Sequence, residues 1–324
     1  MLRKISLPTA PLLVSRLCLG TNMFGTALDQ AHANAVLDRF IALGGNFIDT
    51  ARMYGDWVPG APTGASERVI GAWLKGQPRD SLVIATKGAG MDLRAGDWQP
   101  RVTPECIERD LGESLQHLDV AHIDLYWLHA DDPTKPVKPI IDALVAQQRA
   151  GRIRFFGASN WSPARIAEAQ AYATSVGHAG FVAVEPFWGL AVPNPEAARA
   201  QGYWPYYEEG YRSHHAGALP MIPYSGQCRG FFTKLAQGGE AALPEALKAI
   251  YVNEGNSRRL KTVQALAARH RASINQIVLA YLLCQPELTV PIIGVSRPEQ
   301  LDDAVQAASV TLSADELARL RAGV

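Results

Sequence analysis

Short apolar runs alternate with amphipathic segments along almost the whole chain, and this alternation limits the possible folds more than any other feature. Eight of the runs are nearly continuous in hydrophobicity, which is typical of parallel strands that are buried on both faces. We expect strands at Arg16–Leu19, Asn46–Asp49, Ser81–Thr86, Ile123–Leu128, Ile153–Gly157, Phe181–Glu185, Leu219–Ile222 and Val290–Ile293.

The segments between these runs carry helix patterns with recognisable starts. Such starts are Thr103-Pro104, Ser162-Pro163, Ser273-x-x-Gln276 and Ser313-x-x-Glu316. Because a crossover helix covers one face of a parallel sheet, the pattern predicts an α/β fold. We expect a (β/α)₈ TIM barrel that spans residues 1–324 as a single domain. An open, doubly wound sheet is the alternative that the same pattern allows.

Regions outside the regular pattern also carry information. Pro8 and Pro11 precede the first expected strand and favour an N-terminal hairpin at the barrel floor. Three longer irregular stretches are Trp57–Gly64, Leu190–Gly210 and Gly226–Gly255. Loops of this length in a compact domain are usually functional, so we expect them to contribute to a site.

Composition excludes several classes of protein. The 31 Lys and Arg residues balance 31 Asp and Glu residues, so no basic excess favours nucleic-acid binding. The apolar run Ile277–Cys284 is far shorter than the ~20 residues of a membrane span. The four cysteines form no C-x-x-C or C-x-x-H motif, so we expect neither a metal site nor a redox pair. With no convincing signal peptide, we expect a cytoplasmic protein; the oligomeric state stays open.

Polar residues stand at the ends of three expected strands, where the catalytic groups of a barrel collect. Asp49 ends the second strand, with Tyr54 five residues later, Lys87 follows the third strand and His129 follows the fourth. An ammonium near a phenol lowers the phenol pKa, a carboxylate keeps the ammonium charged, and an imidazole orients a substrate oxygen. The set suits protonation of a carbonyl oxygen while hydride reaches the carbon.

Each of these residues also has an ordinary structural interpretation. Asp49 suits a cap of the turn after its strand, Tyr54 a packing residue, Lys87 a solvated charge and His129 part of a polar rim. The agreement of three separate strand ends favours a site.

Several segments, in this order, resemble the aldo-keto reductase superfamily over essentially the whole chain. They are Leu19–Asn22, Phe47–Gly55, Ser66–Gly71, Ala85–Lys87, Leu125–His129, Phe156–Trp161, Ile222–Ser225 and Pro291–Pro298.

The resemblance implies a barrel that reduces aldehydes or ketones with NADPH, with Tyr54 as proton donor and Asp49, Lys87 and His129 in the roles given above. It also implies cofactor contacts along the mouth, some of them near the nicotinamide and others near the adenosine. These contacts are Gly20, Thr21, Asn22, Asp49, Ser159, Asn160, Glu185, Tyr224, Ser225, Gly294, Ser296, Arg297, Gln300 and Asp303.

The residues themselves bear on the cofactor as well. No G-x-G-x-x-G motif follows a first strand and no P-loop motif occurs, so neither a Rossmann-type site nor a P-loop is indicated. A barrel can hold phosphates at a helix start near its last strands, and Ser296-Arg297-Pro298 is such a start. Arg297 offers a planar donor fork for a 2′-phosphate, which favours NADPH over NADH.

Two positions depart from the family pattern. Glu185 stands where a glutamine is usual, and a carboxylate cannot donate a hydrogen bond to the nicotinamide carboxamide. Ala304 stands where an asparagine is common, which removes one adenine contact.

Aromatic residues in or beside the expected mouth loops suggest a pocket for an apolar or ring-bearing carbonyl compound. We expect Trp57, Trp161 and Trp188 to line it, in a group with Phe187, Tyr203, Trp204, Tyr206 and Tyr207. Two other functions remain open: a Schiff-base aldolase that uses Lys87, and a nucleotide-sensing or partner-binding barrel with low turnover.

Overall fold

The computed structural model describes residues 1–200 and 219–323. Its centre is a sheet of seven parallel strands in the order β8-β7-β6-β5-β4-β3-β9. The strands are β3 (Cys18–Gly20), β4 (Phe47–Asp49), β5 (Val83–Gly88), β6 (Ile123–Leu128), β7 (Ile153–Ser159), β8 (Val184–Glu185) and β9 (Ile292–Ile293). Neighbours in the sheet are mostly neighbours in sequence, as in a barrel and unlike a doubly wound sheet.

The sheet closes through a short segment rather than through an eighth regular strand. Met221 bridges both Val184 of β8 and Thr289, in parallel on each side. Backbone N–H groups of Ile222 and Val290 donate to carbonyls across these two seams, each at 2.8 Å. The expected strand at Leu219–Ile222 is therefore present only as isolated bridges, and the α/β barrel prediction is confirmed.

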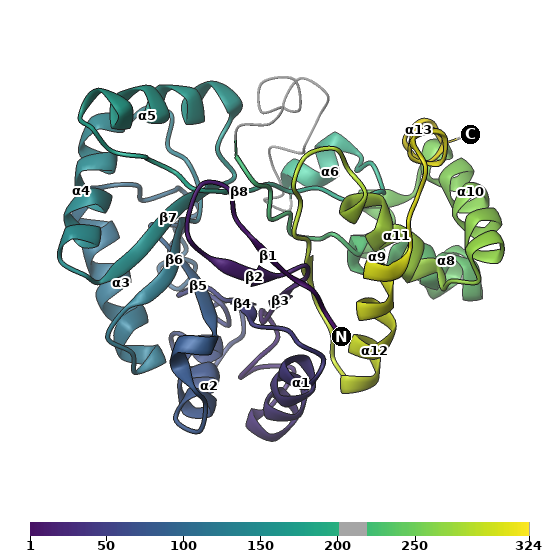
Figure 1. Cartoon of the computed structure of the whole chain (residues 1–324), viewed down its shortest axis with the longest axis horizontal. Coiled ribbons are helices and arrows are strands. Elements are labelled where there is room, and N and C mark those ends of the chain that lie inside the picture. Colours follow the sequence, from purple (N-terminus) through teal and green to yellow (C-terminus); the bar gives the residue numbers. More distant parts are fainter. Residues whose placement is uncertain (201–218, 324) are drawn as a thin grey trace.

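Helices surround the strands, α1 to α5 on one side and the later helices on the other (Figure 1). They are α1 (Gln30–Ala42), α2 (Ala65–Leu74), α3 (Pro104–Leu118), α4 (Val137–Arg149), α5 (Pro163–Ser175), α6 (Pro195–Ala200), α8 (Phe231–Gly238), α9 (Glu245–Tyr251), α10 (Glu254–His270), α11 (Ile274–Leu283), α12 (Pro298–Gln306) and α13 (Ala314–Ala322). Short 3₁₀ turns are η1 (Arg79–Ser81), η2 (Cys228–Gly230), η3 (Glu240–Ala242) and η4 (Ala307–Ser309).

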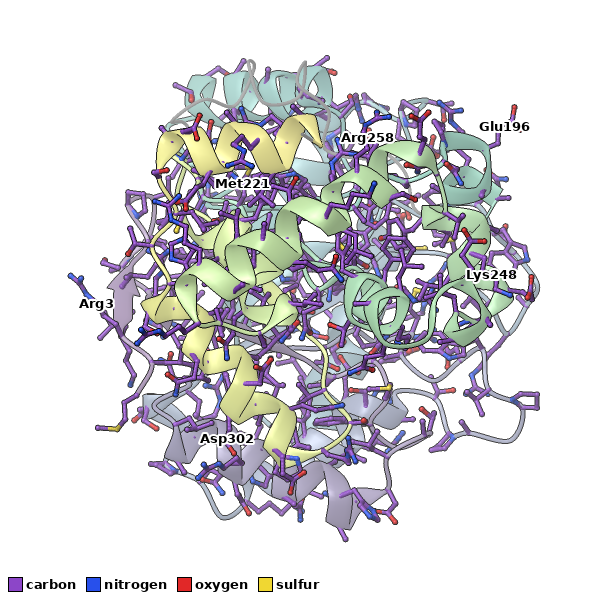
Figure 2. The ribbon with its side chains drawn as sticks, turned by 90° about the vertical axis from the view of Figure 1, so that its right-hand side faces the viewer. Arg3, Glu196, Met221, Lys248, Arg258 and Asp302 are labelled. Atoms are coloured by element: carbon purple, nitrogen blue, oxygen red, sulfur yellow. The ribbon has the colours of Figure 1, made fainter. Side chains whose placement is uncertain are left out.

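The C-terminal helices form an outer layer that Figure 2 views face on. Lys248 of α9, Arg258 of α10 and Asp302 of α12 mark its surface there. The stretch Gly226–Gly255, expected to be irregular, contains α8 and α9, so that expectation is wrong. Amphipathic helices this short give little periodic signal.

Side-chain caps fix the helix starts as predicted. Thr103 accepts from the Cys106 N–H at the start of α3, and Ser162 accepts from the Arg165 N–H at the start of α5. Reciprocal capping boxes begin α11 at Ser273 and α13 at Ser313. Each cap pairs backbone N–H groups that a helix start leaves free.

The barrel interior is filled with side chains and closed below by an N-terminal hairpin. Strands β1 (Lys4–Ser6) and β2 (Leu13–Ser15) pair antiparallel, and the hairpin lies across the centre of the strands (Figure 1). Its Leu7, Leu12 and Val14 join the interior cluster that contains Trp127 of β6. The floor hairpin is thus confirmed.

Gly157 of β7 makes room for the largest interior side chain. A Cβ at this position would lie 2.4 Å from the Trp127 ring, closer than packed atoms approach. Among the described residues, no helix is both long and apolar enough to cross a membrane. Within the same ranges, no three His, Cys, Asp or Glu side chains group as metal ligands.

Candidate active site

Three of the four predicted catalytic side chains meet around one ammonium group at the C-terminal end of the strands. Lys87 of β5 donates to the Oδ2 atom of Asp49, to the Thr50 carbonyl at 2.9 Å and to Tyr54 Oη at 3.0 Å. The register explains the meeting, since Asp49 pairs with Ala85 on the neighbouring strand, two residues before Lys87. The Thr50 carbonyl had no signal in the sequence.

The Lys87–Asp49 ion pair is fully buried, with side-chain exposures of 1% and 2%. Burial alone would lower the pKa of Lys87, but the charges of Asp49 and Glu185 outweigh it and hold that pKa well above its usual value. Burial raises the pKa of Asp49, against the opposing effect of Lys87. Removal of one partner from such a pair is costly, because it leaves a buried charge without compensation.

Tyr54 lies on a tight turn between β4 and Trp57, half-buried in the mouth. Its ring packs edge-on against Trp57 and His129, with centroids 5.9 and 6.1 Å away. The turn is anchored by Arg52, whose guanidinium binds Asp56 at 3.2 Å and Glu113 of α3 at 2.7 Å. Arg52 is a positioning residue that the sequence did not reveal.

The sequence predicts a lowered pKa for Tyr54, but in the structure this pKa is raised. Burial raises the pKa of Tyr54 above its ordinary value, and the charges of Asp49 and Glu185 add to the rise. Lys87 lowers this pKa as expected, but its effect is smaller than the rise that burial causes. Desolvation therefore outweighs the single ammonium.

His129 is a neutral imidazole beside this cluster. Burial and then the charge of Lys87 lower its pKa to about 3. Its Nδ1 atom is buried and has no hydrogen-bond partner among the described residues. A buried acceptor without a partner costs less than a buried donor without one, so the ring proton belongs on Nε2.

Glu185 of β8 also reaches the ammonium, with Oε1 3.5 Å from Lys87 Nζ. Its carboxyl is buried, and Oε2 has no partner in the part of the chain that the structure describes. The family resemblance implied a cofactor contact at this position but did not predict its place beside Lys87.

The residues expected near a nicotinamide form one hydrogen-bonded group. Asn160 donates to the His129 carbonyl at 3.0 Å and accepts from Tyr224 Oη at 2.8 Å. Ser159 Oγ donates to the Glu185 carbonyl at 3.0 Å. Asn160 and Ser225 both have φ of +59°, a left-handed conformation that is uncommon outside glycine and clusters at functional sites.

The loop after β3 begins with Gly20, Thr21 and Asn22, and one of these residues, Thr21, holds the backbone beside Asp49. Thr21 is buried, and its hydroxyl donates to the Asp49 carbonyl at 2.9 Å and lies 2.8 Å from Ser66 Oγ. The neighbouring Asn22 is exposed. At Gly20, a Cβ would lie 2.7 Å from Ile292, so this glycine permits close packing of β3 against β9.

The residues expected around the adenosine end lie at the exposed start of α12. Gln300 Oε1 accepts from the Ser296 and Arg297 N–H groups at 2.8 and 3.3 Å. Gln227 Oε1 accepts from the Gly294 N–H at 2.9 Å. Gln227 had no signal in the sequence, because its partner is distant along the chain.

Two further features belong to this end of the site. Asp303 accepts from Asn275 and Gln276 of α11, each at 2.8 Å, so its carboxylate ties the two helices together. The Arg297 side chain is exposed and makes no ion pair with the described residues.

The predicted pocket aromatics separate into two groups. Trp57 is 47% exposed beside Tyr54. Trp161 is fully buried, donates to the Ala130 carbonyl and packs on Phe181, and the buried Trp188 packs on Tyr281. These two indoles therefore lie in the packed core, not at an open surface. Phe187 is buried and stacks on Tyr224, whereas Tyr203, Trp204, Tyr206 and Tyr207 lie outside the described residues.

A parallel barrel whose mouth joins a buried Lys–Asp pair to a tyrosine and a neutral histidine has the layout of an oxidoreductase for small carbonyl compounds. Residues 16–323 match the family described as Aldo/keto reductase, and the chain belongs to this family. Aldo-keto reductases generally use nicotinamide cofactors.

Three curated relatives align over most of their lengths. A Bacillus subtilis (strain 168) protein described as uncharacterized oxidoreductase YrpG is 31% identical, over 95% of this chain and 91% of its own. Aldo-keto reductase ausK of Aspergillus calidoustus is 29% identical, over 97% and 80%. Protein tas of Escherichia coli (strain K12) is 28% identical, over 98% and 96%.

Proposed function

We propose that the protein reduces an aldehyde or ketone to an alcohol, with NADPH as hydride source and Tyr54 as proton donor. One observation carries the proposal: Lys87 Nζ donates to Tyr54 Oη at 3.0 Å. An ammonium has no lone pair to accept a proton, so the Tyr54 hydroxyl proton must point elsewhere. It is free to point at a carbonyl oxygen in the mouth.

The residues divide the work of the reaction. A nicotinamide held beside Ser159, Asn160 and Tyr224 would supply the hydride, with its electron pair, for the carbonyl carbon. The carbonyl oxygen then takes the Tyr54 proton, and Lys87 stabilises the phenolate that remains. Neutral His129, with its proton on Nε2, donates a hydrogen bond that holds the carbonyl oxygen in place. Asp49 keeps Lys87 charged throughout.

The chain offers groups that fit the cofactor. Ser159, Asn160 and Tyr224 present amide and hydroxyl groups beside His129, which suits a carboxamide. The start of α12 offers the exposed guanidinium of Arg297, which suits a phosphate. We place the 2′-phosphate of NADPH on Arg297.

A Schiff-base aldolase is disfavoured by the surroundings of Lys87. A nucleophilic lysine must lose its proton, and such lysines have lowered pKa values. Here the pKa of Lys87 is raised and all three ammonium protons have acceptors.

The proposed donor is tested by Tyr54→Phe. We expect kcat for carbonyl reduction to fall by about 10²- to 10⁴-fold, the usual contribution of a general acid, with NADPH affinity unchanged. The matched control is Tyr172→Phe, since Tyr172 also contacts a lysine and an aspartate, but on the surface. The control should keep wild-type turnover. Near-wild-type turnover of Tyr54→Phe across aldehydes, ketones and quinones would refute the assignment.

The cofactor preference is tested by Arg297→Ala. Loss of a charge-assisted hydrogen bond should weaken NADPH binding by about 10- to 100-fold and leave NADH binding unchanged. Fluorescence titration measures both affinities, and Arg258→Ala in α10 is the control. Equal affinity for the two cofactors, unaltered in Arg297→Ala, would remove the case for NADPH.

A further inference from the structure

Two carboxyl groups compete for one ammonium at the centre of the barrel mouth. Asp49 Oδ2 accepts a hydrogen bond from Lys87, and Glu185 Oε1 lies 3.5 Å from the same nitrogen. All three side chains are at most 2% exposed. If both carboxyls were ionised, the buried cluster would carry a net negative charge, which a water-poor interior strongly disfavours.

The contacts of the ammonium distinguish the two carboxyls. An ammonium has three protons, and those of Lys87 go to Asp49, the Thr50 carbonyl and Tyr54. No ammonium proton is directed at Glu185 over a distance as short as these three. The second oxygen of each carboxyl, Oδ1 of Asp49 and Oε2 of Glu185, has no partner within residues 1–200 and 219–323, so the contact with Lys87 is what separates the two groups. Buried carboxylates need hydrogen bonds to stay ionised. Asp49 Oδ2 receives a direct hydrogen bond from the ammonium, whereas Glu185 Oε1 lies 3.5 Å from the same nitrogen.

We propose that Glu185 is a positioning residue that carries a proton in the resting protein, so that Asp49 alone neutralises Lys87, and that its ionisation at alkaline pH makes Tyr54 a weaker acid. The second half rests on the proposed role of Tyr54 as proton donor. The first half concerns the protein alone.

Charged and titratable groups face Glu185 from several strands. Cys18 lies on β3, Asp49 on β4, Tyr54 after β4 and Lys87 on β5, and each of these interacts with Glu185 or is shifted by it. Burial and then the charge of Asp49 raise the pKa of Glu185 well above its ordinary value. In turn, the charge of ionised Glu185 raises the pKa of both Tyr54 and Lys87. Ionisation of Glu185 at alkaline pH therefore makes Tyr54 a weaker proton donor.

The proton on Glu185 is tested in the free protein. Infrared spectra at neutral pH should contain a protonated-carboxyl band that disappears in Glu185→Gln and, in the wild type, at alkaline pH. Glu108→Gln, at an exposed position of α3, is the control and should leave the band in place. Identical spectra of wild type and Glu185→Gln at neutral pH would overturn the proposal.

Two more readouts keep the test decisive. Wild-type protein labelled with ¹³C at the glutamate carboxyls should contain one glutamate that titrates far above the others, and this measurement needs no variant. Because folded Glu185 holds its proton above the pH at which the unfolded chain loses it, stability should fall as pH rises through the raised pKa. This loss should be absent in Glu185→Gln. If no glutamate titrates high, the proposal is wrong.

The effect on Tyr54 is measured separately, by ultraviolet titration of the phenolate against Tyr54→Phe. In Glu185→Gln the phenolate should appear at lower pH than in the wild type, and an unchanged titration would overturn the second half. None of these measurements uses cofactor or substrate. A failure of Tyr54→Phe to lose activity would therefore refute the proposed function and leave the proton on Glu185 standing.

Discussion

Within the part of the chain that the structure describes, two clusters consist of a lysine, a tyrosine and an aspartate. In the mouth, Lys87 donates to Tyr54 at 3.0 Å and lies 4.8 Å from the centre of its ring. On the surface, Lys138 of α4 donates to Tyr172 of α5 at 2.7 Å and lies 5.0 Å from its ring centre. Each lysine also binds an aspartate, Asp49 in one cluster and Asp142 in the other.

The two clusters differ in exposure and so in electrostatics. The side chains of Lys87 and Asp49 are 1% and 2% exposed, against 67% and 48% for Lys138 and Asp142. Hydrogen bonds from Lys138 and Tyr172 lower the pKa of Asp142, whereas burial raises the pKa of Asp49. The same three residue types thus make an ordinary contact on the surface, whereas in the buried mouth the charge of each group strongly changes the pKa of the others.

The largest expected effect comes from Lys87→Met. Removal of the ammonium leaves Asp49 buried without compensation, which should lower the free energy of unfolding by about 3–5 kcal/mol near neutral pH. The deficit should shrink at acidic pH, because Asp49 then takes up a proton. Urea unfolding at several pH values measures both effects.

Lys138→Met is the matched control for this comparison. Its cluster is exposed and screened by solvent, so we expect little change in stability and none in carbonyl reduction. Equal losses in Lys87→Met and Lys138→Met would contradict the view that burial separates the two clusters.

Strand ends, rather than residue types, distinguish the two clusters in the sequence. Asp49, Lys87 and His129 each follow an apolar run, and parallel strands bring such ends to one edge. The spacing of four residues between Lys138 and Asp142 also predicts an ion pair on one helix. Nothing local in the sequence indicates that Tyr172 contacts this pair. The barrel and the meeting of the proposed catalytic residues Asp49 and Lys87 were therefore predictable.

The finer features of the site depend on distances between segments far apart in the chain. The third acceptor of Lys87 is the Thr50 carbonyl, and a backbone group carries no sequence signal. The net rise in the pKa of Tyr54 depends on the depth of burial, which residue types do not give. Trp161 and Trp188 were predicted to line a pocket because they are aromatic residues in or beside the expected mouth loops, yet core packing uses the same aromatic residues.

A smaller effect should come from His129, the imidazole beside the buried cluster. Its pKa is lowered to about 3, against 6.5 for an ordinary histidine. Below pH 6.5 the unfolded chain binds a proton that the folded protein refuses, so stability falls as pH decreases. Between pH 6.5 and 5 we expect a loss of about 1–2 kcal/mol from this residue.

His129→Asn isolates this contribution, because asparagine keeps a hydrogen-bonding side chain but does not titrate. The difference in free energy of unfolding between wild type and variant should therefore change with pH, in favour of the variant below pH 6.5. Well above pH 7 the difference should be constant, since the imidazole is then neutral in both the folded and the unfolded chain. A difference that is constant from pH 7 down to pH 5 would mean that His129 accepts a proton in the folded protein. Neither burial nor the ammonium of Lys87 would then be strong enough to keep the imidazole neutral in the folded protein.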